Sequence, residues 1–174
     1  MIKTAKEIAF AGITVALLIG GQLALSAVSG VEIVTAIFAV YCFVFGVLNG
    51  VIVATAFSLI RCFIFGFFPQ VILLYLIYYN LFAVAVGVLG AMVKDKKVWF
   101  KILVLTVCSA VLTVLFTLID NLLNVLLFSL SSSAANIYFV QSIPVMVSQV
   151  VCVSVTVPLF FYPLEKIFLL SKTK

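Results

Sequence analysis

The distribution of charged residues most tightly constrains what this chain can fold into. Twelve of its 15 charged side chains fall in three clusters, and the stretches between the clusters are long and apolar. The clusters are Lys3, Lys6 and Glu7; Lys94, Asp95, Lys96, Lys97 and Lys101; and Glu165, Lys166, Lys172 and Lys174. A membrane-spanning helix needs about 20 predominantly apolar residues, which these stretches supply. We therefore expect an all-α integral membrane protein.

The composition excludes a soluble domain. Hydrophobic residues make up 67% of the 174-residue chain and charged residues 9%, whereas a soluble domain carries about 25% charged residues. The chain has no histidine, the commonest general base and metal ligand, and it has neither a cluster of reactive groups nor a P-loop. We therefore expect neither an enzyme nor a nucleic-acid-binding protein, and we expect no cofactor and no metal site.

The apolar stretches divide into six segments that form a single membrane domain over residues 1–174. The least obvious division is within residues 33–66, which would make one helix of about 50 Å, too long for a hydrocarbon core of about 30 Å. Asn49-Gly50 is a turn signal that splits it. The expected spans are 8–28, 33–48, 51–66, 70–92, 101–128 and 144–164.

The basic residues predict the orientation. With six spans and the N-terminus inside, all three charged clusters lie on the cytoplasmic side, as the positive-inside rule requires. With five spans, Lys94–Lys101 would face outside. We therefore expect a multi-pass plasma-membrane protein with cytoplasmic N- and C-termini and outer connections at 29–32, 67–70 and 129–143.

A cleaved signal peptide is the rival interpretation of the N-terminus. Lys3 and Lys6 precede an apolar run, as in such peptides. The uncharged run from Ile8 to Val31 is longer than the usual apolar region of about 7–15 residues, and its removal would leave five spans. We therefore expect the segment to remain as the first span.

Small residues recur along the first segment at steps of three or four, so they share one helical face. They are Ala5, Ala9, Gly12, Ala16, Gly20, Ala24 and Ala27. In lipid, a small-residue face lets another helix approach closely. The partner is either another helix of this chain or a second membrane protein.

A polar stripe runs along the fifth segment at the same steps: Thr106, Ser109, Thr113, Thr117, Asp120 or Asn121, and Asn124. Such a stripe cannot face lipid, so it faces the bundle interior or a cavity. More aromatic and amide side chains lie in the outer halves of the fourth and sixth segments: Tyr75, Tyr78, Tyr79, Asn80, Gln141 and Gln149. We predict an outward-open cavity for a neutral or zwitterionic, partly aromatic small molecule.

Arg61 and Asp120 are the strongest single candidates for function, because an ionisable group within a membrane is costly. Either they form a structural ion pair or one or both contact a polar ligand. Glu32, in the first outer connection, is either a solvated loop residue or part of a lid over the same cavity.

The chain resembles the substrate-specific S components of energy-coupling-factor (ECF) transporters. The resemblance covers nearly the whole chain: six spans, both termini inside and a small-residue first helix. It also rests on Ala5-xxx-Ala9 and Gly12-xxx-Ala16, on Phe-Gly-Val-Leu-Asn-Gly at 45–50, and on Gly66-Phe-Phe-Pro69 before a Tyr-rich helix.

The resemblance implies that the chain captures a vitamin or related organic micronutrient from outside. Its implied partners are a membrane coupling subunit, docked on Ala5, Ala9, Gly12 and Ala16, and two ATPase subunits. The implied substrate region includes Tyr75, Tyr79, Asn80, Asp120, Asn124, Gln141 and Gln149, close to Glu32, and Arg61 joins this set as an intramembrane charge. The nickel and cobalt members need an N-terminal histidine, which this chain lacks.

Two other functions stay open. One is a small oligomeric secondary transporter, although the chain shows no internal repeat between residues 1–92 and 93–174. The other is a structural membrane subunit without a ligand of its own.

Overall fold

The computed structural model describes residues 5–26 and 33–172, and within these ranges the chain is helical and contains no strand. This confirms the all-α prediction. The helices are α1 (Ala5–Leu25), α2 (Val34–Phe45), α3 (Val47–Phe65), α4 (Pro69–Val93), α5 (Val98–Leu127) and α6 (Ser132–Lys172). Glu32 and the other residues of 27–32 lie outside the described ranges.

Five of the helices are long and apolar enough to cross a membrane, which is compatible with a multi-pass membrane protein. The exception is α2, whose 12 residues extend about 18 Å, well short of a core of about 30 Å. The expected full span at 33–48 is therefore replaced by a short helix.

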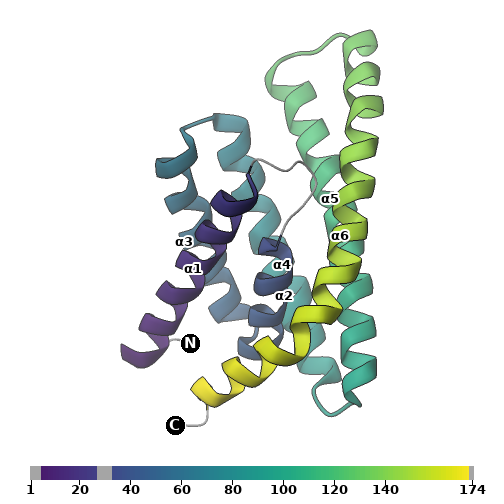
Figure 1. Cartoon of the computed structure of the whole chain (residues 1–174). Helices are drawn as coiled ribbons and strands as arrows, with labels where there is room; N and C mark the ends of the chain where they lie inside the picture. Colours follow the sequence, from purple (N-terminus) through teal and green to yellow (C-terminus); the bar gives the residue numbers. More distant parts are fainter. Residues whose placement is uncertain (1–4, 27–32, 173–174) are drawn as a thin grey trace.

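Successive helices run in alternating directions (Figure 1). As a result, the two ends of the described chain and the α4–α5 turn lie at the same end of the bundle (Figure 1). We call this the charged end, because it carries Glu7, the lysines of 94–101 and Glu165. The α3–α4 and α5–α6 connections lie at the opposite end (Figure 1).

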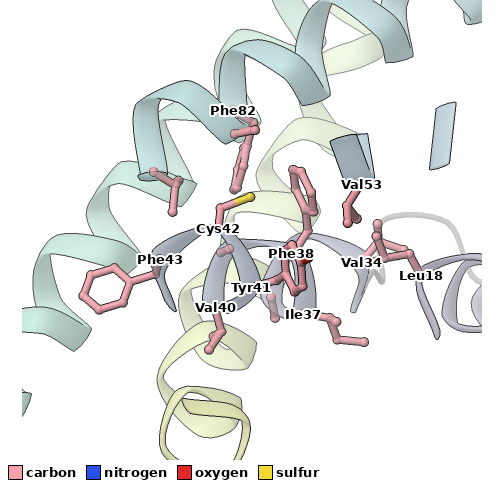
Figure 2. Close-up of a cluster of buried hydrophobic side chains, with 14 of the residues drawn as sticks. Leu18, Val34, Ile37, Phe38, Val40, Tyr41, Cys42, Phe43, Val53 and Phe82 are labelled. Carbon is pink, nitrogen blue, oxygen red and sulfur yellow. The ribbon is translucent and has the colours of Figure 1, made fainter. Parts of the chain in front are cut away.

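The short helix α2 forms the centre of the core. Every side chain from Val34 to Phe43 is buried, as expected for a helix that is apolar on all faces. Figure 2 shows its side chains pointing in several directions, with Phe38 close to Phe82 of α4. The two ring centroids lie 5.6 Å apart. The long helices therefore pack around α2.

The chain turns between α2 and α3 at Gly46, and the break predicted at Asn49-Gly50 is wrong. Gly46 has φ +80°, a left-handed conformation that favours glycine. Gly50 lies within α3 for a different reason: a Cβ added there would come within 2.9 Å of the Cys42 Sγ atom. The second glycine permits close packing of α2 and α3, whereas the first makes the turn.

Helix α6 begins twelve residues before the predicted span at 144–164, so the outer loop expected at 129–143 is mostly helical. The Ser131 hydroxyl accepts a hydrogen bond from the Ala134 N–H (3.3 Å), which is the geometry of an N-cap. The serine-rich stretch that suggested a loop is thus a helix start. Pro144, Pro158 and Pro163 lie inside α6, although proline cannot donate a backbone hydrogen bond.

The C-terminal part of α6 turns away from α5 and passes across the charged end towards α1 and α2 (Figure 1). Its Phe168 ring lies 6.0 Å from the Phe10 ring of α1 and 5.7 Å from the Tyr41 ring of α2. The opposite part of α6 packs along α5. This pairing at the opposite end forms the site described next.

Candidate binding site

The polar stripe of α5 faces the bundle interior, as predicted. Five of its side chains are buried: Ser109, Thr113, Thr117, Asn121 and Asn124. Asp120 and Thr106, beside them, are half-buried. Because the stripe ends near the α5–α6 connection, its most polar members lie at the opposite end from the lysines.

Asp120 is held by neighbours from both helices. The Asn124 side-chain amide donates to Asp120 Oδ1 (3.1 Å) and to the Asp120 backbone carbonyl (2.8 Å). The Tyr138 hydroxyl of α6 donates a long hydrogen bond to Asp120 Oδ2 (3.4 Å). The carboxylate is thus fixed in position while keeping acceptor capacity, since two carboxylate oxygens offer about four sites.

Asn121 makes a second link between α5 and α6. Its amide N–H donates to Ser142 Oγ (2.8 Å), and that hydroxyl donates to the Phe139 carbonyl (2.8 Å). Asn121 is 1% exposed, and its Oδ1 atom has no hydrogen-bond partner. A buried amide oxygen without a donor is costly, so this atom is a place where a donor would be favourable.

A cavity of about 300 Å³ lies between α5 and α6 beside these groups. It is lined by Phe116, Thr117, Asp120, Tyr138, Gln141, Ser142, Val145 and Gln149. Its volume is at the lower end of the range for small-molecule sites, which is about 300–1,000 Å³. Asp120 is the sole charged residue in this lining, so the cavity offers one carboxylate together with amide and hydroxyl groups that can donate or accept hydrogen bonds.

Arg61 lies in a separate cluster formed by α1, α3 and α4. Its Nε atom donates to Gln22 Oε1 (3.1 Å), and the Gln22 amide donates to the Tyr75 hydroxyl (2.9 Å). The guanidinium carbon lies 3.9 Å from the centroid of the Tyr75 ring and 4.8 Å from that of Phe65. These contacts replace the ion pair with Asp120 that the sequence left open.

The remaining α4 candidates are structural neighbours of this cluster. Thr55 Oγ1 donates to Asn80 Oδ1 (3.2 Å), and the Asn80 amide donates to the Leu76 carbonyl (2.7 Å). Tyr79 is buried, with its ring 5.1 Å from that of Phe57. We expected α4, α5 and α6 to line the cavity. In the structure its lining residues come from α5 and α6, and none comes from α4.

Phe116 separates the two polar regions. Its ring lines the α5–α6 cavity. The centroid of the same ring lies 6.0 Å from that of Tyr75 and 4.8 Å from that of Tyr78, both on α4. A void of about 10 Å³ between α2, α4 and α5 also touches Phe116, and it has room for at most one water molecule. The aromatic side chains thus close the space between the clusters.

The structure brings together four of the predicted site residues: Asp120, Asn124, Gln141 and Gln149. It places Arg61 and Tyr75 in the other cluster, with Tyr79 packed against Tyr75, while Asn80 bonds to Thr55 of α3, and Glu32 lies outside the described ranges. Gln22, Phe116, Tyr138 and Ser142 were not predicted as site neighbours. Recognising Ser131 as an N-cap would have placed Tyr138 and Ser142 on a helix facing α5.

The small-residue face of α1 points away from the rest of the chain. Ala9, Gly12 and Ala16 are exposed, and a Cβ added at Gly12 would meet no atom within 4 Å. The buried face of α1 is instead formed by Ala11, Thr14, Val15, Leu18 and Ile19. For the side chains described, packing within the chain does not account for the small residues; the side chain of Ala5 lies outside the described set.

Comparison with protein-family models, with curated proteins and with solved structures gives no significant match for this chain. Over residues 5–26 and 33–172, no three His, Cys, Asp or Glu side chains gather in a group that could hold a metal ion. Function is therefore inferred from the geometry of the cavity and of α1.

Proposed function

We propose that this chain is the substrate-binding S component of an ECF transporter. It captures a small organic micronutrient from outside, with the charged end and both termini in the cytoplasm of a plasma-membrane protein. The observation that carries the proposal is the cavity between α5 and α6, because it combines an anchored carboxylate with amide and hydroxyl groups at the end opposite the lysines. An ionisable side chain that faces the interior of a membrane bundle is by default a candidate for a substrate or ion pathway.

The lining of the cavity narrows the class of ligand. A molecule that donates hydrogen bonds and carries a positive charge complements the Asp120 carboxylate, and Phe116 offers an aromatic wall beside it. An anionic ligand would meet a carboxylate with no basic group in the lining. The micronutrient is therefore a partly aromatic amine or amidine. Such a molecule is cationic, whereas the sequence predicted a neutral or zwitterionic one.

The exposed face of α1 is the proposed docking surface for the membrane coupling subunit. Ala9, Gly12 and Ala16 leave a shallow surface against which a helix of another protein packs closely. Two ATPase subunits supply the energy through that coupling subunit. Ligand binding and docking thus use separate surfaces.

The direct test is a screen of the purified protein against water-soluble vitamins and their precursors, read by thermal shift and by mass spectrometry of co-purified ligand. We expect stabilisation by a cationic aromatic compound and no stabilisation by anionic ones. A panel that yields no binder contradicts the proposal.

The docking assignment has its own test in a transport assay with the ATPase subunits present. Replacing Ala9, Gly12 and Ala16 with leucine blocks transport and leaves ligand binding unchanged. The control is Leu17→Phe, which adds bulk at a neighbouring exposed position of α1 outside the small-residue face. Equal loss of transport in the control contradicts docking on this face.

One observation favours a second function, a small secondary transporter driven by protons. Asp120 is an ionisable group facing a cavity within an apolar helix, as in many proton-coupled carriers. Uptake into vesicles that lack any ATPase, driven by a proton gradient, distinguishes the two functions. Such uptake, abolished by Asp120→Asn, replaces the ECF proposal with the second one.

A further inference from the structure

A second cavity, of about 410 Å³, lies at the charged end of the bundle. It is bounded by the ends of α2, α4 and α6 and by the first turn of α5. Its walls include apolar residues such as Phe43, Phe45 and Leu169, and its charged residues are Lys94, Asp95, Lys101 and Glu165. Nothing in the transport proposal uses this space.

Two glycines of α4 shape the cavity. Gly87 and Gly90 lie against the backbone of Val47 and Phe43, where an added Cβ would collide. Because these positions carry no side chain, α4 approaches the α2–α3 turn closely and leaves an unfilled space towards α6. The space is thus a consequence of how the helices pack.

Two of the four charged residues in the cavity lining form an ion pair with each other. Lys101 Nζ lies 3.6 Å from Glu165 Oε1, and both side chains are largely buried, at 16% and 14% exposure. Lys94 and Asp95, by contrast, are exposed at the rim. The buried pair neutralises itself, and Lys94 is the cation of the lining that is exposed at the rim, next to Asp95.

The surroundings favour an anion with an apolar body. Across residues 94–101 and Glu165, four lysines outnumber two acidic residues. Large apolar side chains are exposed beside them, including Met92 at 71% and Trp99 at 88%. A small inorganic anion gains nothing from contact with apolar side chains, whereas a phospholipid has both a phosphate for the lysines and acyl chains for the apolar surface. The charges of the cavity lining itself balance, two lysines against two acids, so the preference for an anion comes from the lysines around it; a lysine near a membrane surface contributes about 1 kcal/mol to binding an anionic lipid.

We propose that the cavity at the charged end binds the phosphate group of an anionic phospholipid. Lys94 contacts the phosphate at the rim, the headgroup occupies the space between α4 and α6, and the acyl chains run along the exposed apolar side chains. The bound lipid fixes the charged end of the bundle to the leaflet surface.

The test uses the full chain in nanodiscs of phosphatidylcholine with and without phosphatidylglycerol, with retained lipid counted by native mass spectrometry after transfer to detergent. We expect the protein to retain phosphatidylglycerol in preference to phosphatidylcholine. Lys94→Gln lowers that retention about fivefold, as expected for one lysine at a lipid surface. The matched control is Lys166→Gln, which removes the same charge from an exposed position of α6 outside the cavity lining.

A second variant tests the cavity without changing any charge. Ala91→Leu adds three carbon atoms at a lining position of α4 and lowers phosphatidylglycerol retention while thermal unfolding in detergent stays unchanged. A third arm adds inorganic phosphate to the detergent-purified protein, where we expect no thermal stabilisation. Equal losses in Lys94→Gln and Lys166→Gln, unchanged retention in Ala91→Leu, or stabilisation by inorganic phosphate equal to that by phosphatidylglycerol would each overturn the proposal.

Discussion

Asp120 and Arg61 are both ionisable groups in apolar helices, but the protein surrounds them differently. The Arg61 guanidinium lies over the rings of Tyr75 and Phe65, and its Nε atom donates to Gln22. Asp120 is held by Asn124 and by Tyr138, and it lines a cavity together with Tyr138. The Arg61 guanidinium stacks on rings of the fold and does not line the cavity between α5 and α6, whereas the Asp120 carboxylate is oriented by its neighbours and lines that cavity.

This difference separates two roles that look the same in the sequence. A charge within an apolar segment is costly in either case, so its presence alone marks a constraint without saying which kind. The surrounding groups decide. Arg61 joins α1, α3 and α4 to one another, and Asp120 offers unused acceptor capacity to a ligand.

The largest expected effect comes from Asp120→Asn. The substitution keeps the shape of the side chain and removes the negative charge, so a cationic ligand loses a charge-assisted hydrogen bond. We expect affinity to fall about 10- to 100-fold, since such a bond contributes about 1.5–3 kcal/mol. The measurement is calorimetric titration with the compound identified by the vitamin screen.

Folding must be checked for the same variant, because Asn124 and Tyr138 also contact the carboxylate. An asparagine still accepts from the Asn124 amide through its oxygen, so we expect the thermal midpoint to change little. Wild-type affinity in a folded Asp120→Asn protein would remove Asp120 from the binding site.

The second prediction concerns Arg61→Met and has the opposite pattern. The variant loses the stack on Tyr75 and leaves Gln22 Oε1 without its donor, so the free energy of unfolding falls by about 1–2 kcal/mol. Ligand affinity stays within about twofold, because Arg61 does not line the cavity. Denaturant titration and calorimetry measure the two quantities.

Tyr75→Phe is the control for this pattern. It keeps the aromatic ring under Arg61 and removes the hydroxyl that accepts from Gln22, so the expected loss of stability is smaller, about 0.5–1 kcal/mol. A large loss of ligand affinity in Arg61→Met would show that the two clusters are not separate in function.

The sequence predicted the parts of the fold that follow from local composition. Apolar length located the helices, and the three- and four-residue spacing of Ser109, Thr113 and Thr117 predicted the buried face of α5. The turn between α2 and α3 was predicted at the wrong place because Asn49-Gly50 is a stronger local turn signal than Gly46. Gly50 instead serves close packing, since an added Cβ would come within 3.1 Å of the Ala83 Cβ atom of α4, a residue distant in sequence.

The site was harder to predict for the same reason. Arg61 contacts Gln22, 39 residues earlier in the chain, and no spacing rule connects them. Asp120 and Asn124 are one helical turn apart, so their contact was within reach of a pattern. Tyr138 was not predicted as a site residue, because the serines before it indicated a loop, whereas Ser131 is the N-cap of a helix.

A third and smaller effect is expected for the glutamines, which occur on both sides of the comparison. Gln149→Leu removes one neutral hydrogen-bonding group from the cavity lining and weakens ligand affinity about two- to tenfold. Gln22→Leu removes the partner of Arg61 and Tyr75, so it lowers stability and leaves affinity unchanged. Titration of both variants with the same ligand compares them directly. An equal loss of ligand affinity in the two variants would show that both clusters belong to one binding site.

The smallest expected value is the energetic coupling between Arg61 and Asp120. Distant residues without shared partners have additive effects to within about 0.5 kcal/mol, whereas a buried ion pair leaves a much larger coupling when either charge is removed. Stabilities of Arg61→Met, Asp120→Asn and the double variant complete the cycle by denaturant titration in one detergent. Because Arg61 is held by Gln22 and Tyr75 and Asp120 by Asn124 and Tyr138, the coupling is expected within that additive range. A coupling well above it would restore the ion pair that the sequence left open, and both charges would then belong to the scaffold, with neither free for a ligand.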